Sequence, residues 1–163
     1  QPRSRGLGDV YKRQFSYQLM FENRTIPLLA YPPETVLAEK LETILSRGEA
    51  NTRLRDFYDV YILQREDFVV TPDALCHALL ATCRKRGHED LLHTYASILN
   101  EVRQSGAMRA QWMKYQTDFD YAAGITWDTV LDTVETLCMK TLDDHAFGDE
   151  LPQEESQFEM HLL

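Results

Sequence analysis

The sequence predicts a mostly helical α+β fold, in which two short strands precede six helices. Two observations carry this prediction. Apolar residues alternate with period two near the start of the chain and then recur at helical spacing from about residue 34 onward. Pro, Gly, Asn and Thr residues separate these segments at positions suited to turns and helix caps. The short Gly-containing connections favour an antiparallel helical bundle.

The two predicted strands lie in residues 15–31. Phe15, Tyr17, Leu19 and Phe21 alternate with other residues, which is the pattern of a half-buried strand rich in aromatic side chains. After a polar turn, residues 26–31 form a second short extended run that ends at two prolines. Because two strands alone are marginally stable, we expect them to complete a sheet with strands that lie upstream.

The helices follow from apolar stripes bounded by capping residues. Thr71 is a suitable N-cap before a proline, and Gly48 and Gly87 are suitable C-caps. The Asn51-Thr52 pair offers N-cap side chains for the second helix. The six helices are expected at 34–47, 53–65, 72–86, 89–104, 107–121 and 126–143. The last stretch, 149–163, has five acidic residues and no Lys or Arg, and is predicted to be an acidic tail.

Residues 1–14 are interpreted as an artefact of sequencing. They are basic, carry two glycines and show no apolar periodicity. Ser4–Gln14 look like a translated transposon-end sequencing adapter, whose last six codons would be GAT GTG TAT AAG AGA CAG. We therefore expect residues 1–14 to be disordered, and the rest to be the C-terminal part of a longer protein.

Charge and composition narrow the class of protein. The 163 residues contain 17 Lys and Arg against 26 Asp and Glu, for a formal net charge of -9. This acidity argues against a protein that coats nucleic acid through bulk charge, although a local basic site is compatible with it. No apolar run approaches the roughly 20 residues of a membrane-spanning helix. The three cysteines have no disulfide or zinc spacing, so a reducing cytoplasm is expected.

Lys40 and an acidic pair do not fit a pure packing account. Lys40 falls on the apolar stripe of its helix, so its charge must either extend outward or meet an anion. Asp56 and Asp59 are three residues apart on the next helix and share one face. Adjacent carboxylates repel unless a cation compensates, although both could simply favour a helix N-terminus. Together these residues suggest a phosphate-handling site.

Two segments carry an unusual joint pattern: residues 31–41 (YPPETVLAEKL) and 51–61 (NTRLRDFYDVY). They resemble the YPxExxxAEKL and NTRxxDxYD segments of the AbiEii/AbiGii nucleotidyltransferase toxin family. The match is dense over residues 31–63 and diffuse afterwards, where Gln111-Trp112 is similar to the helical C-terminal part of such proteins.

The resemblance implies a DNA polymerase β-like nucleotidyltransferase fold. Residues 15–66 would be the end of the nucleotidyltransferase domain, with the last part of its sheet, and residues 67–148 a helical domain. The resemblance makes Lys40 the contact to the nucleoside triphosphate (NTP) and Asp56 an acidic residue required for transfer. Asp59 is a secondary candidate with a possible structural role, and Arg53 and Arg55 are candidates for phosphate or RNA contacts, with solvated surface arginine as the alternative.

The resemblance also implies two-metal chemistry and partners. Mg²⁺ ions would bind the NTP, and a hydroxyl of an RNA acceptor such as a tRNA would attack the α-phosphate. The family's Gly-Ser or Gly-Gly loop and metal-binding Asp-x-Asp pair lie on upstream strands, and no such loop followed by paired aspartates occurs from Phe15 onward. We therefore expect no metal ligands in this fragment and no activity. A cognate antitoxin and a role in phage defence by abortive infection are implied as well.

Other functions remain open at this point. The chain could be a non-catalytic helical interaction module in which Lys40 and Asp56 form only an ion pair. A metal-dependent hydrolase using His77, His88 or His93 is weaker, because these histidines lack ligand spacing. The basic run at 84–88 could contact RNA, but a helix C-terminus explains the same residues.

Overall fold

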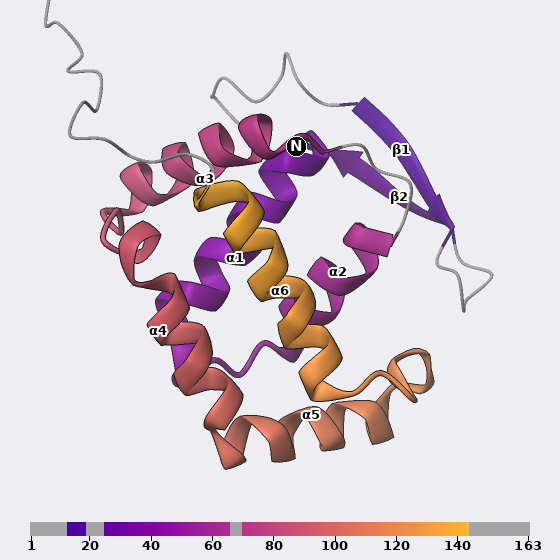
Figure 1. Ribbon diagram of the computed structural model, residues 1–163. Helices are drawn as coiled ribbons and strands as arrows, with labels where there is room; N and C mark the ends of the chain where they lie inside the picture. The colour runs from indigo at the N-terminus through magenta and orange to yellow at the C-terminus, as the bar shows by residue number, and fades with distance from the viewer. Residues whose placement is uncertain (1–12, 19–24, 66–69, 144–163) are drawn as a thin grey trace, which may run out of the picture.

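The computed structural model describes residues 13–18, 25–65 and 70–143, and the side chains of the last two ranges from Tyr31 onward. Within these ranges the chain is mostly helical, with six α-helices and a two-stranded ladder (Figure 1). The predicted acidic tail, 149–163, and residues 1–12 lie outside the described residues. The mostly helical part of the fold prediction is therefore confirmed.

The two strands form an antiparallel hairpin beside the helices (Figure 1). Strand β1 spans Arg13–Gln18 and strand β2 spans Thr25–Ala30, with Phe15 opposite Leu28. β1 includes Arg13 and Gln14, the last two residues of the segment that was expected to be disordered. The later half of the first predicted extended run falls in residues 19–24, outside the described residues.

Helices α1 and α2 carry the candidate site residues Lys40, Asp56 and Asp59. Helix α1 spans Pro33–Arg47 and ends at Gly48, whose φ of 50° is a conformation that glycine adopts without strain. A single 3-10 turn, Gly48–Ala50 (η2), follows it. Helix α2 spans Leu54–Arg65. The two predicted ranges are thus reproduced to within one residue.

The remaining helices lie close to the predicted ranges, and α3 begins at its predicted cap. They are α3 (Pro72–Arg86), α4 (Leu91–Gln104), α5 (Gly106–Asp118) and α6 (Trp127–Leu142). The Thr71 hydroxyl accepts a hydrogen bond from the Ala74 amide at 3.2 Å, and Gly87 closes α3 in the left-handed conformation. Such local signals set helix ends because they satisfy backbone groups that have no partner within the helix.

Helix α5 is shorter than predicted. The sequence favoured a helix to residue 121, whereas α5 ends at Asp118, Phe119 is extended, and a 3-10 turn, Asp120–Ala122 (η3), follows. The side-chain amide of Gln116 donates to the Ala122 and Ile125 carbonyl oxygens at 3.2 and 2.7 Å. These bonds hold the returning chain against α5 and end the helix early.

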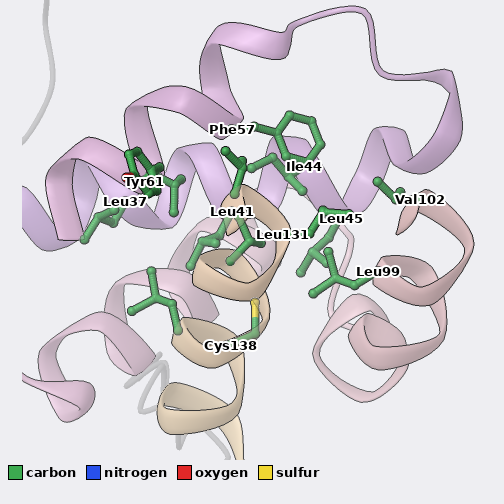
Figure 2. Packing of buried hydrophobic residues seen from close by; sticks show 14 of the residues in the cluster. Leu37, Leu41, Ile44, Leu45, Phe57, Tyr61, Leu99, Val102, Leu131 and Cys138 are labelled. Carbon is green, nitrogen blue, oxygen red and sulfur yellow. The ribbon is translucent and has the colours of Figure 1, made fainter. Parts of the chain in front are cut away.

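The core is one apolar cluster shared by α1, α2, α3, α4, α5 and α6. Figure 2 shows side chains of α1, such as Leu41 and Leu45, pointing toward Leu131 of α6 and Leu99 of α4. Helix α6 packs against α2, α3, α4 and α5, whereas α5 lies across one end of α6 in Figure 1. The antiparallel arrangement that the sequence predicts is therefore not seen between α5 and α6 (Figure 1). Its crossing position is what closes one side of the site.

Candidate functional site

Lys40 of α1 lies between the two carboxylates of α2. Its Nζ is 3.1 Å from Asp56 Oδ1 and 2.7 Å from Asp59 Oδ2. The side chains of Lys40, Asp56 and Asp59 are 21%, 4% and 25% exposed, so Asp56 is the buried member. A lysine on an apolar stripe must either extend outward to solvent or meet an anion. In the structure, Lys40 meets two anions.

The turn between α1 and α2 sets this geometry. Asn51 is fully buried, and its Oδ1 accepts a hydrogen bond from the Arg53 amide at 2.7 Å. This Asn side-chain turn fixes the direction in which α2 begins. Asp56 then falls in the first turn of α2, with Asp59 one turn further on the same face. Asn51, named in the sequence only as a cap candidate, is thus an anchor of the site.

Arg53 and Arg55 lie outside the two carboxylates. Arg53 Nε is 3.3 Å from Asp56 Oδ2, and Arg55 Nε is 3.8 Å from Asp59 Oδ1. Both arginine side chains are more than half exposed, at 58% and 68%. They are surface arginines that also take part in the ion-pair network. Their exposed guanidinium groups remain accessible to a second anion.

This network lines a cleft of about 650 Å³ between the start of α2 and helix α5. A volume of this size is in the usual range for small-molecule sites, roughly 300–1,000 Å³. The lining residues are Lys40, Thr52, Arg53, Leu54, Arg55, Asp56, Asp59, Gln111, Lys114, Tyr115, Asp118 and Phe119. Four are basic and three are acidic, so the cleft carries a small positive excess in a chain whose formal net charge is -9.

The α5 wall of the cleft was missed by sequence reasoning. Gln111, Lys114, Tyr115 and Asp118 recur at helical spacing and form one face of α5. The sequence interpretation noted only Gln111-Trp112; Trp112 is buried, and its Nε1 donates to the Ile125 carbonyl at 2.8 Å. The polar and aromatic face of α5 was the available signal, but nothing in the sequence indicated that it faces Lys40.

The carboxylates of this site do not suit a divalent cation. The Lys40 ammonium group already fills the position between Asp56 and Asp59. One Asp-x-Asp triplet, residues 118–120, does occur, but it follows a helix rather than a Gly-Ser loop, and Asp118 pairs with Lys114 at 2.9 Å. Across residues 13–18, 25–65 and 70–143, no group of three or more His, Cys, Asp or Glu side chains is placed to hold a metal ion.

The three histidines considered for a hydrolase do not form a joint site. His77 and His93 are exposed on α3 and α4. His88 Nδ1 lies 2.6 Å from Glu42 Oε1, and Arg86 binds the other oxygen of the same carboxylate. Glu42 is buried, with 1% of its side chain exposed. Two residues of the basic run at 84–88, Arg86 and His88, therefore link the end of α3 and the turn after it to α1 through Glu42.

Other sequence expectations concern the cysteines and the membrane. Cys76, Cys83 and Cys138 are all free and buried. Burial raises the pKa of all three thiols, to about 11 for Cys83. In the part of the chain that the structure describes, no helix is long and apolar enough to cross a membrane.

Comparison with known proteins identifies the family. A family model described as nucleotidyl transferase AbiEii toxin, type IV toxin–antitoxin system, matches residues 6–133. The match covers more than half of the chain and includes α1, α2 and α5, which form the cleft. No curated protein and no solved structure matches the sequence. The chain therefore belongs to the AbiEii family of nucleotidyl transferase toxins of type IV toxin–antitoxin systems.

Proposed function

We propose that the cleft binds the triphosphate of an NTP and that the complete protein transfers the nucleotide to an RNA acceptor, such as a tRNA. The observation that carries this proposal is the Lys40 ammonium group, held by two carboxylates at the wall of a cleft with a positive excess. A held ammonium group can bind phosphate oxygens without first losing the rotational freedom of a long side chain. Arg53 and Arg55 extend the cationic surface beside it.

In this proposal Lys40 contacts the phosphates, and Asp56 acts through Lys40. One oxygen of Asp56 binds the Lys40 ammonium group, and the other, Oδ2, lies beside Arg53 with no hydrogen-bond partner among the described residues. A buried carboxylate of this kind fixes cations more rigidly than an exposed one. Asp59, which is more exposed, supports the same lysine from the cleft side.

In this proposal, the Mg²⁺ ligands of the reaction lie on residues that precede β1. Mg²⁺, when bound, would neutralise the triphosphate and activate the attacking hydroxyl. The Lys40 site does not offer the ligands, and the sequence from Phe15 onward has no Gly-Ser or Gly-Gly loop followed by paired aspartates. We therefore propose that the ligands come from strands preceding β1, in a polymerase β-like sheet that the hairpin completes, and that the 163-residue chain alone transfers nothing.

A transfer assay tests the proposal. The purified 163-residue chain and a form extended by the genomic sequence upstream of Phe15 are incubated with each α-labelled NTP, Mg²⁺ and bulk tRNA. We expect label on the RNA with the extended form alone. Label transferred by the short chain, free of host enzymes, would contradict the assignment of the metal ligands. An intact gene without a Gly-Ser loop and Asp-x-Asp pair would instead favour an interaction module, in which the Lys40–Asp56 ion pair is only structural.

The biological role proposed for the complete protein follows its family. A cognate antitoxin is implied by a type IV toxin–antitoxin system. We propose action on RNA in the cytoplasm and a role in phage defence. Co-expression of the extended form with its neighbouring gene, scored by growth with and without phage, tests this role separately from the chemistry.

A further inference from the structure

We propose that the α5 wall of the cleft binds the nucleobase of the same NTP whose phosphates Lys40 contacts, with Phe119 as the stacking surface and Gln111 as the contact to the base edge. The inference rests on the proposed function and deepens it, because it names the residues that would select the nucleotide. The two walls of the cleft differ in chemistry in the way that the two ends of a nucleotide differ.

The first wall is charged. Lys40, Arg53 and Arg55 come from α1 and α2, together with the carboxylates that pair with them. The second wall, formed by α5 and by Phe119 directly after it, contributes the aromatic rings of Tyr115 and Phe119 beside the Lys114–Asp118 ion pair. A single cleft of about 650 Å³ that joins a cationic wall to an aromatic wall suits one ligand with an anionic and a flat apolar end. An NTP has both.

Phe119 is exposed although it belongs to an aromatic cluster. Its side chain is among the exposed large apolar groups, at 41%, and it borders the cleft. Its ring lies 4.7 Å from the Tyr115 ring centroid and 5.3 Å from that of Tyr121, nearly parallel to the latter at 29°. The sequence predicted a longer helix, 107–121, that includes Phe119. The early end of α5 instead turns this ring toward the cleft.

The aromatic side chains behind Phe119 pack closely against one another. Trp112 stacks on Tyr115 at 5.3 Å with an angle of 23°, and the Tyr115 and Tyr121 hydroxyls share a hydrogen bond at 2.9 Å. The indole of Trp112 is itself buried and bonded to the Ile125 carbonyl. A ring held by such neighbours loses little entropy on binding, so a base can stack on its free face at little cost.

Gln111 supplies the polar contact that a base edge requires. It lines the cleft one helical turn before Tyr115, and its amide makes no hydrogen bond to the residues that the structure describes. An amide both donates and accepts, as the edges of bases do. Phe119 would therefore contribute to binding any base, since stacking is tolerant of sequence, and Gln111 would contribute to the choice among bases.

The test separates base from phosphate. The 163-residue chain is titrated by calorimetry, in Mg²⁺, with ATP, GTP, CTP and UTP in turn, and with inorganic tripolyphosphate as a ligand without a base. Phe119→Ala is expected to raise the Kd of every bound NTP by at least about fivefold and to leave the Kd of tripolyphosphate unchanged. Phe119→Tyr, which keeps a stacking ring, should restore NTP binding. Gln111→Ala should narrow the differences among the four NTPs.

Controls keep the outcome specific. Met113→Ala removes an apolar side chain of α5 that is 63% exposed and does not line the cleft, so it should change no Kd. Circular dichroism checks that each variant is folded.

Equal affinity of the unmodified chain for tripolyphosphate and all four NTPs would overturn the inference and leave the phosphate site standing. Unchanged NTP binding in Phe119→Ala would also overturn it. So would a parallel titration with single-stranded RNA in which Phe119→Ala weakens RNA binding but not NTP binding. Absence of binding to every ligand would overturn the Lys40 phosphate site itself, and the inference with it.

Discussion

Glu42 and Asp56 are both buried carboxylates that bind basic side chains, but they lie in different surroundings. Glu42 of α1 has both oxygens engaged, one by His88 Nδ1 at 2.6 Å and one by Arg86. Asp56 of α2 has one oxygen on Lys40 and another with no hydrogen-bond partner among the described residues, and it lines the cleft. Lys40 and Glu42, two residues apart on α1, point to different faces of the helix.

Glu42 thus makes a structural ion-pair contact, whereas Asp56 belongs to a candidate binding site. Glu42 joins α1 to the end of α3 and the turn after it, where no ligand is needed to complete its contacts. The Asp56 network instead leaves a lysine and two arginines at the edge of a cleft. Buried charges of similar composition can therefore serve stability in one place and binding in another. Substitutions on each side should separate these two roles.

The largest expected effect is on nucleotide transfer. In the extended form that includes the proposed metal ligands, Lys40→Ala should lower the transfer rate on the order of 10²- to 10³-fold, because a held positive charge at the phosphates is lost. Helix content should remain, since Arg53 still pairs with Asp56. Lys140→Ala, an exposed lysine of α6 outside the cleft, is the matched control. An unchanged rate in folded Lys40→Ala would remove this lysine from the site.

The next effect should appear in stability alone. Leu41 is fully buried beside Lys40 on α1, so Leu41→Ala should lower the free energy of unfolding in urea by about 2–4 kcal/mol through lost packing and a cavity. At temperatures where the variant is folded, its NTP affinity should equal that of the unmodified chain. A loss of NTP affinity in the folded Leu41→Ala variant would mean that NTP binding depends on core packing as well as on the charges of the cleft.

Loss of the Glu42–Arg86 ion pair should change the free energy of unfolding by a smaller amount. Arg86→Ala should destabilise the chain by about 1–2 kcal/mol, because Glu42 keeps His88 but loses its second partner. The estimate is modest because the Arg86 side chain is 41% exposed and screened by solvent. Arg84→Ala, an exposed neighbour on α3, should leave urea unfolding unchanged. Loss of RNA binding in Arg86→Ala with unchanged stability would argue for a nucleic-acid contact instead.

The last effect, confined to alkaline pH, is a pH dependence near Glu42. Burial, reinforced by the negative charge of Glu42, raises the pKa of the Cys83 thiol to about 11 from 9.0. Between these values the unfolded chain releases this proton while the folded chain keeps it, so stability falls as pH rises from 9 toward 11. Urea unfolding of Cys83→Ala should show a shallower decline over this range. Parallel declines in both proteins would assign the alkaline loss to other groups.

Local sequence signals predicted the helices but not their mutual placement. Thr71, Gly48 and Gly87 act where they were expected, because caps satisfy backbone groups within a few residues. The end of α5 was wrong, because Gln116 reaches carbonyl oxygens of a segment that returns to α5. Glu42 was not singled out, since nothing near it in the sequence indicates that it is buried against the end of α3.

The sequence by itself determined that Lys40 lies on an apolar stripe, where its charge must either extend outward or meet an anion, and that Asp56 and Asp59 share a helix face. Both follow from helical periodicity. The family also follows from the sequence, through the matching family model. Only the tertiary structure decided that Lys40 lies between these two carboxylates, that Asp56 is the buried one, and that α5 supplies the opposite wall of the cleft. These depend on how helices far apart in the chain pack, which is a property of the whole core and not of any short segment.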